Sequence, residues 1–96
     1  MIIAKVVGNI WATRKEESLV GRKLMIVQPS RISGEPVGEC IVAVDSVDAG
    51  IGEMVLVATG SSARRAEGQQ ASPVDASIVA IIDIHEVTRP RDESNG

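Results

Sequence analysis

The chain has 96 residues and a net charge of −3, and its 44% of apolar residues include a single aromatic side chain, Trp11. A chain of this length forms one domain that buries only about 60% of its unfolded surface, so a partner subunit would add to its stability. The acidic balance gives no positive field for a phosphate backbone, which argues against nucleic acid as the main partner.

The N-terminus and the only cysteine indicate the cellular compartment of the protein. Met1 to Val7 has no basic stretch before its apolar part, unlike a secretory signal. Lys5 and Asp83 interrupt the apolar runs well before the roughly 20 residues of a membrane helix. Cys40 cannot form an intrachain disulfide, and within its apolar run a thiol acts as a small hydrophobe. We therefore expect a cytoplasmic protein that does not contact a membrane.

Five or six short runs rich in Val and Ile, separated by Gly, Pro, Ser and Asp, predict an all-β fold of the small barrel or sandwich type. Gly8 permits a bulge or a sharp bend between the first two runs, and Pro29 ends the third. A charged connection, Arg14–Ser18, follows the second run. The expected strands are Ile2–Val7, Asn9–Thr13, Lys23–Gln28, Cys40–Val47, Met54–Thr59 and Ser77–Val87.

The connecting segments predict loops, one helical turn and a tail. Pro29 to Glu39 contains two glycines and a further proline, which indicates a surface loop. Arg65 to Ser72 is polar and predicts a mobile loop, and Pro73 to Ala76 predicts a single helical turn. The tail 89–96 has no apolar residue to bury, so we expect it to be disordered. The folded domain is therefore expected to span residues 1–88.

The expected strands near the middle and the end of the chain are apolar on both faces. Side chains alternate between the faces of a strand with a period of two. In the last run, Ile78, Ala80, Ile82 and Ile84 therefore oppose Val79 and Ile81. A strand that is apolar on both faces is usually covered on both sides. Since so short a chain has few elements left for that, a subunit interface is the simplest cover.

No pattern in the sequence predicts a catalytic residue. The only histidine, His85, shares a strand face with Asp83, but no motif places a serine or cysteine beside it. Ser61 and Ser62 lack the Gly-x-Ser-x-Gly arrangement of a nucleophile elbow. A small hydrolase that uses Ser62 or Cys40 with His85 is the enzymatic alternative.

Metal and cofactor sites are not indicated either. Asp45, Asp48 and Glu53 carry oxygen ligands, but their spacing does not match a calcium-binding EF-hand loop. Gly50–Gly52 is only a fragment of a dinucleotide-binding pattern, and the strand that follows provides no helix N-terminus. These glycines instead predict a tight turn with positive φ. Trp11, with its large apolar area, predicts a contact in the core or between subunits.

Several ordered motifs between Met1 and Val87 together resemble one known family. They include Trp11–Lys15, Val27–Pro29, Ala49–Gly52, Val55–Val57 and Gly60–Arg64. The chain resembles the vertex proteins of bacterial microcompartments, the EutN/CcmL family of carboxysomes and of ethanolamine- or glycyl-radical-enzyme shells. The resemblance implies a five-stranded β-barrel related to the OB-fold, with one short helical turn, that assembles as a ring. The sequence of this chain departs from the family pattern at Asp48, where glycine is common.

The resemblance also implies what the protein does. It implies a homopentamer that fills the five-fold corners of a protein shell otherwise tiled by hexameric proteins. That role is structural and requires no catalytic residue, metal or cofactor. An OB-like nucleic-acid or ligand-binding module is the alternative, although the sequence lacks aromatic residues for stacking. The residues expected at a subunit interface or pore are Gly60, Ser61, Ser62, Ala63, Arg64, Ile78, Ala80, Ile82 and Asp83.

Overall fold

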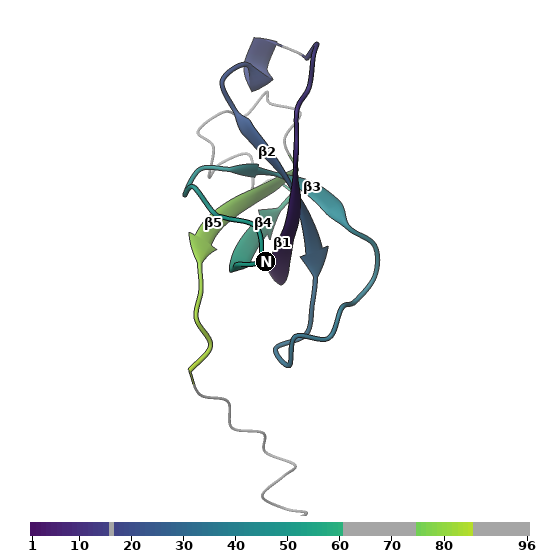
Figure 1. Cartoon of the computed structure of the whole chain (residues 1–96), viewed down its shortest axis with the longest axis vertical. Helices are drawn as coiled ribbons and strands as arrows, with labels where there is room; N and C mark the ends of the chain where they lie inside the picture. Colours follow the sequence, from purple (N-terminus) through teal and green to yellow (C-terminus); the bar gives the residue numbers. More distant parts are fainter. Residues whose placement is uncertain (16, 61–74, 86–96) are drawn as a thin grey trace, which may run out of the picture.

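The protein folds as a closed five-stranded β-barrel in a computed structural model that describes residues 1–15, 17–60 and 75–85 (Figure 1). The strands close in the order β1-β2-β3-β5-β4, and every pairing is antiparallel except the parallel pair β3–β5. The elements are β1 (Ile2–Ile10), the 3₁₀ turn η1 (Glu17–Leu19), β2 (Lys23–Pro29), β3 (Ile41–Asp45), β4 (Met54–Thr59) and β5 (Ala76–Ile81). The predicted all-β barrel is confirmed.

Small aliphatic side chains fill the barrel. Alternate residues point inward except at the bulges of β1 and β5, and the largest of the core side chains belong to Met25 and Ile78. The fully buried apolar residues with no measurable exposure are Ala4, Val6, Val27, Val55, Val57 and Ile78. A five-stranded barrel leaves little room inside, which agrees with a sequence that has almost no aromatic residues.

The bulge expected near Gly8 is present, but the strand continues through it. Val6 pairs with Val27 of β2 and Gly8 pairs with Ile26, so Val7 is the extra residue. A bulge bends a strand without ending its pairing. The prediction of a separate second strand over Asn9–Thr13 is therefore wrong: its first two residues belong to β1, and the rest lie outside any strand.

A second bulge, in β5, changes which residues face outward. Ile78 and Ala80 pair with neighbouring residues of β4, Val57 and Leu56, so Val79 is extra. Residues directly opposite in an antiparallel pair share a face of the sheet. Ile78 therefore faces the core with Val57, whereas Ala80 lies on the outer face with Leu56. The predicted common face of Ile78 and Ala80 is wrong because simple alternation cannot anticipate a bulge.

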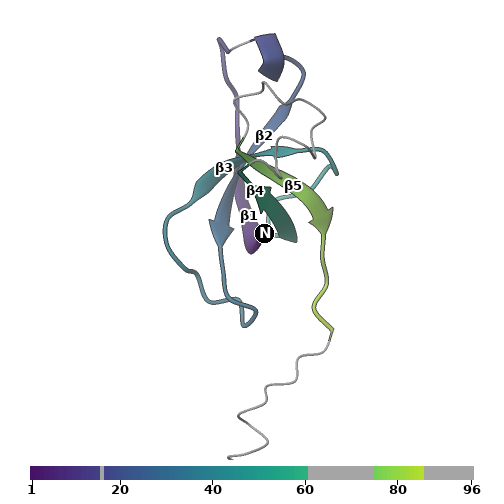
Figure 2. The same ribbon diagram turned by 180° about the vertical axis from the view of Figure 1, so that it is seen from behind.

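Both β3 and β5 are shorter than the runs Cys40–Val47 and Ser77–Val87 that predicted them. Figures 1 and 2 show that the segment after β5 leads away from the barrel, while the ends of β1 and β2 project from its other end toward η1. The paired residues of β5 end at Ile81, and the Ile82 N–H still donates to the Met54 carbonyl of β4 at 2.9 Å.

The structure describes only half of the predicted helical turn. Of the predicted turn Pro73–Ala76, Ala76 belongs to β5, and residues 73 and 74 lie outside the described residues. The described helical turn is η1, which overlaps the charged connection Arg14–Ser18. The predicted loop Arg65–Ser72, the domain boundary at residue 88 and the tail 89–96 also lie outside the described residues.

A buried carboxylate organises the loop after β3. Asp45 Oδ1 accepts a hydrogen bond from the backbone N–H of Val47 at 2.9 Å, and its Oδ2 accepts one from Ala49 at 2.8 Å. Its side chain has no exposed surface, and Lys23 Nζ lies 3.6 Å from Oδ2. One side chain thus satisfies two backbone donors that would otherwise lack partners. Asp45 therefore has a structural role as a cap of this loop.

The next two acidic residues also have structural partners. Asp48 lies in the left-handed region with φ of 60°, which explains physically why glycine suits this position. Lys23 Nζ donates to Asp48 Oδ1 at 2.8 Å, and this hydrogen bond lowers the pKa of Asp48 and raises the pKa of Lys23. Glu53 Oε1 accepts a hydrogen bond from the backbone N–H of Gly50 at 2.6 Å.

The positive φ predicted for the Gly50–Gly52 turn occurs at Gly52 alone. The Glu53 N–H donates to the Gly50 carbonyl at 3.1 Å, and Gly52, with φ of 96°, occupies the third position of this turn. The Gly52 N–H also donates to the Val6 carbonyl at 2.8 Å, which joins the turn to β1.

Replacing Asp45 with alanine should destabilise the protein by about 2 kcal/mol, because two backbone donors would lose their acceptor. Thermal unfolding at a fixed protein concentration, followed by circular dichroism, would measure the change. Asp48→Asn is the matched control. Its side chain is exposed, so loss of its ion pair should change the midpoint little. Equal midpoints for the two variants would contradict the capping role of Asp45.

Replacing Gly52 with alanine should destabilise the protein by about 1 to 2 kcal/mol, because φ of 96° strains any residue with a Cβ. Gly50→Ala should cost less, since a Cβ there would lie 3.3 Å from the Glu53 Oε1 atom, which can move aside. The same unfolding measurement compares the two variants. If Gly50→Ala lost more stability than Gly52→Ala, the assignment of the backbone strain to Gly52 would be refuted.

Candidate subunit interface

The outer surface over β2 and β3 is apolar. Leu24 pairs with Val44 and Ile26 with Val42, and all four face outward because the residues between them face the core. Val44 is nevertheless buried, since it packs in a second small cluster outside the barrel. The members of that cluster are Leu19, Leu24, Val44, Ala58 and Val79. The turn η1 therefore carries an apolar side chain onto the outside of β3.

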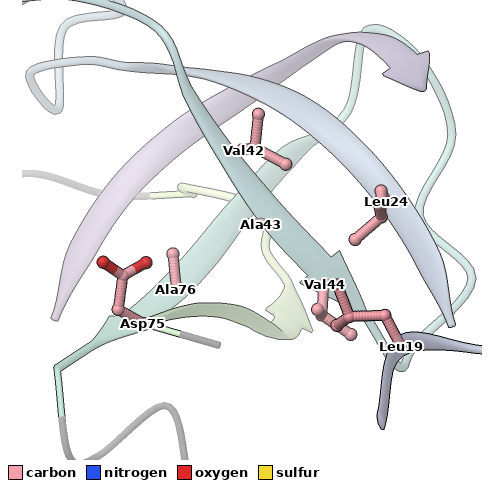
Figure 3. A pocket seen from close by; sticks show the side chains of 7 residues that line it. All are labelled: Leu19, Leu24, Val42, Ala43, Val44, Asp75 and Ala76. Carbon is pink, nitrogen blue, oxygen red and sulfur yellow. The ribbon is translucent and has the colours of Figure 1, made fainter. Parts of the chain in front are cut away.

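A groove of about 230 Å³ lies beside this cluster (Figure 3). We call it the β3 groove, and its lining residues are Leu19, Leu24, Val42, Ala43, Val44, Asp75 and Ala76. Among the described lining residues, Asp75 is the only ionisable one, and Val42 is 48% exposed. The lining that the structure describes is mostly apolar, which suits the packing of an aliphatic side chain, and it contains no pair of nucleophile and base.

A second apolar surface crosses β1, β4 and β5. Leu56 of β4 pairs with Ile3 of β1 on one side and with Ala80 of β5 on the other. All three are partly exposed, and they face outward because the flanking residues of β4, Val55 and Val57, are in the core. We call this line of three residues, Ile3, Leu56 and Ala80, the β4 row.

The structure separates the residues that the sequence predicted for the interface. Gly60 has φ of 65° and donates its N–H to the Asp75 carbonyl at 2.8 Å, beside the β3 groove. Ala80 belongs to the β4 row, Ile82 is partly exposed, and the Asp83 side chain is 90% exposed. Ile78 is fully buried in its own barrel and offers no side-chain surface to a neighbour. Ser61, Ser62, Ala63 and Arg64 lie outside the described residues.

The other candidate residues form no catalytic arrangement in the described part of the chain. His85 Nε2 and Asp83 Oδ2 are 4.0 Å apart, and both side chains are exposed. Cys40 is exposed rather than packed in an apolar run, and its Sγ donates to Gln28 Oε1 at 3.2 Å. Residues 1–15, 17–60 and 75–85 contain no cluster of three or more metal-ligating side chains. None of the described helices could span a membrane.

Trp11 was expected in the core or between subunits. It is 90% exposed and borders a groove with Lys15 and Arg22, so it does not belong to the core, and a contact between subunits stays a prediction. Sequence reasoning missed one feature of this surface. The β4 row was missed because its residues come from three strands and only strand register brings them together. The two-residue alternation within β4 was the available signal, since it places Leu56 opposite Val55 and Val57.

Known proteins resemble the chain over nearly all of its described part. A family model described as ethanolamine utilisation protein EutN/carboxysome matches residues 1–83. The bacterial microcompartment shell vertex protein EutN of Salmonella typhimurium is 43% identical over 83 residues, which are 86% of this chain and 84% of that protein. The carboxysome shell vertex protein CcmL of Synechococcus elongatus is 47% identical over the same shares of the two chains.

The barrel also matches solved structures. The pentameric microcompartment shell protein GrpN from Rhodospirillum rubrum superposes with a TM-score of 0.82 at 42% identity, covering 92% of this chain and all of that one. Gloeobacter violaceus CcmL gives a TM-score of 0.82 at 40% identity, covering 91% and 90% of the two chains. A family match over more than half of the chain, with relatives above 40% identity, establishes that the chain is homologous to these proteins. The chain belongs to the EutN/CcmL family of microcompartment shell vertex proteins.

Proposed function

We propose that five copies of this chain form a ring that closes a corner of a bacterial microcompartment shell. The observation that carries this proposal is the match of the whole barrel to relatives named as shell vertex proteins, one of which is described as pentameric. The protein is a structural component and not an enzyme. Such a shell lies in the bacterial cytoplasm, and this is the location that we assign to the chain.

The physical role of the ring is geometric. Six-membered tiles cover a flat surface, and a five-membered ring introduces the curvature that closes a polyhedron. Ring formation removes apolar surface from water, which stabilises the assembly by about 25 cal/mol for each Å². The partly exposed β4 row and the β3 groove provide such surface on each copy. Hexameric shell proteins are the neighbours that this geometry requires.

Part of the predicted interface remains in this proposal. We assign Gly60, Ser61, Ser62, Ala63 and Arg64 to a subunit contact or to the lining of the central opening, together with Ala80, Ile82 and Asp83. Gly60 supports this assignment because it lies beside the β3 groove. The outward position of Ala80 in the β4 row supports it as well. Ile78 is buried in the core of its own barrel, so it supports the fold that carries these contact residues and does not touch a neighbouring copy.

Native mass spectrometry across a dilution series should give a stable five-fold multiple of the 10.1 kDa chain mass. Assembly from apolar surfaces should persist at micromolar concentration, and a small dependence on salt would agree with a mainly apolar contact. A monomer or dimer at every concentration would refute the ring. The barrel would then match its relatives in fold alone.

Replacing Ile82 with aspartate should convert the ring to monomer or aggregate, because an unpaired charge would be buried at the contact. Size-exclusion chromatography with light scattering measures the assembly state. Ile51→Asp is the control, since Ile51 is 64% exposed in the turn before β4 and should tolerate a charge. An intact ring in the Ile82→Asp variant would remove this residue from the interface.

A further inference from the structure

A groove with one aromatic and three cationic side chains lies where the ends of β1 and β2 project toward η1 (Figure 1). We call it the Trp11 groove. Its volume is about 290 Å³, and its described lining residues are Asn9, Ile10, Trp11, Ala12, Lys15, Arg22, Lys23 and Leu24. We propose that this groove binds an acidic amphipathic segment of another protein, in which carboxylates flank an aliphatic side chain. This inference goes beyond the proposed function, because it gives a structural subunit a docking site.

The floor of the Trp11 groove is apolar and partly exposed. Ile10 of β1 pairs with Leu24 of β2, and both lie outside the barrel because the next residue of β2, Met25, is in the core. Trp11 follows Ile10 and is 90% exposed. An indole has a large apolar area, and exposed tryptophans are enriched where proteins contact one another. An aliphatic side chain of a partner would cover this surface.

Cationic side chains border this apolar floor. Lys15 comes from the connection after β1, and Arg22 and Lys23 come from the start of β2. No acidic residue is among the lining residues that the structure describes. Lys23 already donates to Asp48, but an ammonium group has three N–H donors and a guanidinium has five, so these groups can bind further acceptors. The charge of the groove therefore favours a segment that carries carboxylates.

An acidic peptide suits this groove better than a nucleic acid does. Trp11 is the only aromatic residue of the chain, so the protein offers no series of rings on which successive bases could stack. The net charge of −3 disfavours a long polyanion, whereas a short acidic segment depends only on the charges around the groove. The aliphatic residues Ile10 and Leu24 also fit an aliphatic side chain.

The Trp11 groove differs in character from the β3 groove, although Leu24 lines both. The described lining of the β3 groove has one ionisable residue, Asp75, whereas that of the Trp11 groove has three cations. Permanent assemblies use the more apolar surfaces, and a charged border around a small apolar floor is typical of a contact that forms and dissociates. We therefore assign the Trp11 groove to a separate partner and not to a neighbouring copy.

The single tryptophan shows without a label whether the groove is open in the assembled protein. Trp11 should emit at the long wavelength of a solvated indole, and acrylamide should quench its fluorescence nearly as readily as that of free N-acetyltryptophanamide. Native mass spectrometry of the same sample gives its assembly state. A blue-shifted emission with protection from acrylamide would show that a neighbouring copy covers the indole, and this result would overturn the proposal.

A short synthetic peptide with a central leucine flanked by glutamates is the probe for binding. Its addition should shift the Trp11 emission to shorter wavelength and protect the indole from acrylamide. The anisotropy of a dye-labelled copy gives the dissociation constant, which should rise with salt because ion pairs contribute to binding. The same peptide with glutamine at every glutamate should bind about tenfold more weakly. Equal binding of both peptides, or no binding of the glutamate peptide at millimolar concentration, would contradict the proposal.

Lys15→Glu and Arg14→Glu are a matched pair of variants. Both replace an exposed cation with an acid and change the net charge equally, but of the two residues only Lys15 lines the groove. Lys15→Glu should weaken binding of the glutamate peptide about tenfold, and Arg14→Glu should leave it nearly unchanged. An equal loss in the two variants would attribute binding to overall charge and would remove the groove as its site. Unchanged binding in Lys15→Glu would refute the role of the cations.

Trp11→Ala tests the apolar part of the groove. Because Trp11 is 90% exposed, this variant should keep the thermal unfolding midpoint of the parent chain, while peptide binding by anisotropy should be lost. Full binding in Trp11→Ala would show that the peptide binds elsewhere. A single-stranded oligonucleotide with the same dye is the last comparison. If it bound more tightly than the glutamate peptide and also required Trp11, the groove would be a nucleic-acid site and the assignment to an acidic protein segment would be wrong.

Discussion

The narrow interior of a five-stranded barrel is the constraint on which the rest of this structure depends. Its inward positions hold small aliphatic residues such as Val6, Val27 and Val57, which are fully buried. Apolar residues beyond these must face outward, and they do so on β2, β3 and β4. A chain with this many aliphatic residues in so small a barrel therefore has apolar surface left over. Assembly into a ring is the physical consequence that we propose.

Two bulges adapt the strands to this closure. The extra residues Val7 and Val79 let β1 and β5 bend around the barrel while their pairing continues. Each bulge also shifts the face of every residue that follows it. The outward position of Ala80, and therefore the β4 row, depends on the second bulge. A local irregularity of the backbone thus determines which side chains a neighbouring copy can contact.

The acidic residues around the turn before β4 serve the fold rather than chemistry. Asp45 binds two backbone N–H groups, Glu53 binds a third, and Asp48 pairs with Lys23. Three carboxylates close together in sequence can suggest a metal site, but here each has its own hydrogen-bond partner. Their structural roles agree with membership of a family of shell proteins in which no catalytic step is needed.

Several features of the fold and the site could be predicted from the sequence. Runs of Val and Ile indicated the strands, with β4 placed at its observed bounds, and Gly8 indicated a bulge. The ordered motifs indicated the family, because they combine residues needed at many separate turns and strands. These signals are local: a period of two, a glycine where φ is positive, and a proline that ends a strand.

The tertiary structure alone decided which of these residues share a surface. Ile3, Leu56 and Ala80 are far apart in the sequence and become neighbours only through the register of three strands. The burial of Ile78 likewise depends on which side of the barrel its backbone position faces, and Trp11 is exposed because it lies beyond the end of β1. Local propensity carries no information about register across strands, since one extra residue at a bulge exchanges the inner and outer faces. The sequence by itself therefore determined the strands and the family, and the closed barrel decided where the apolar surfaces lie.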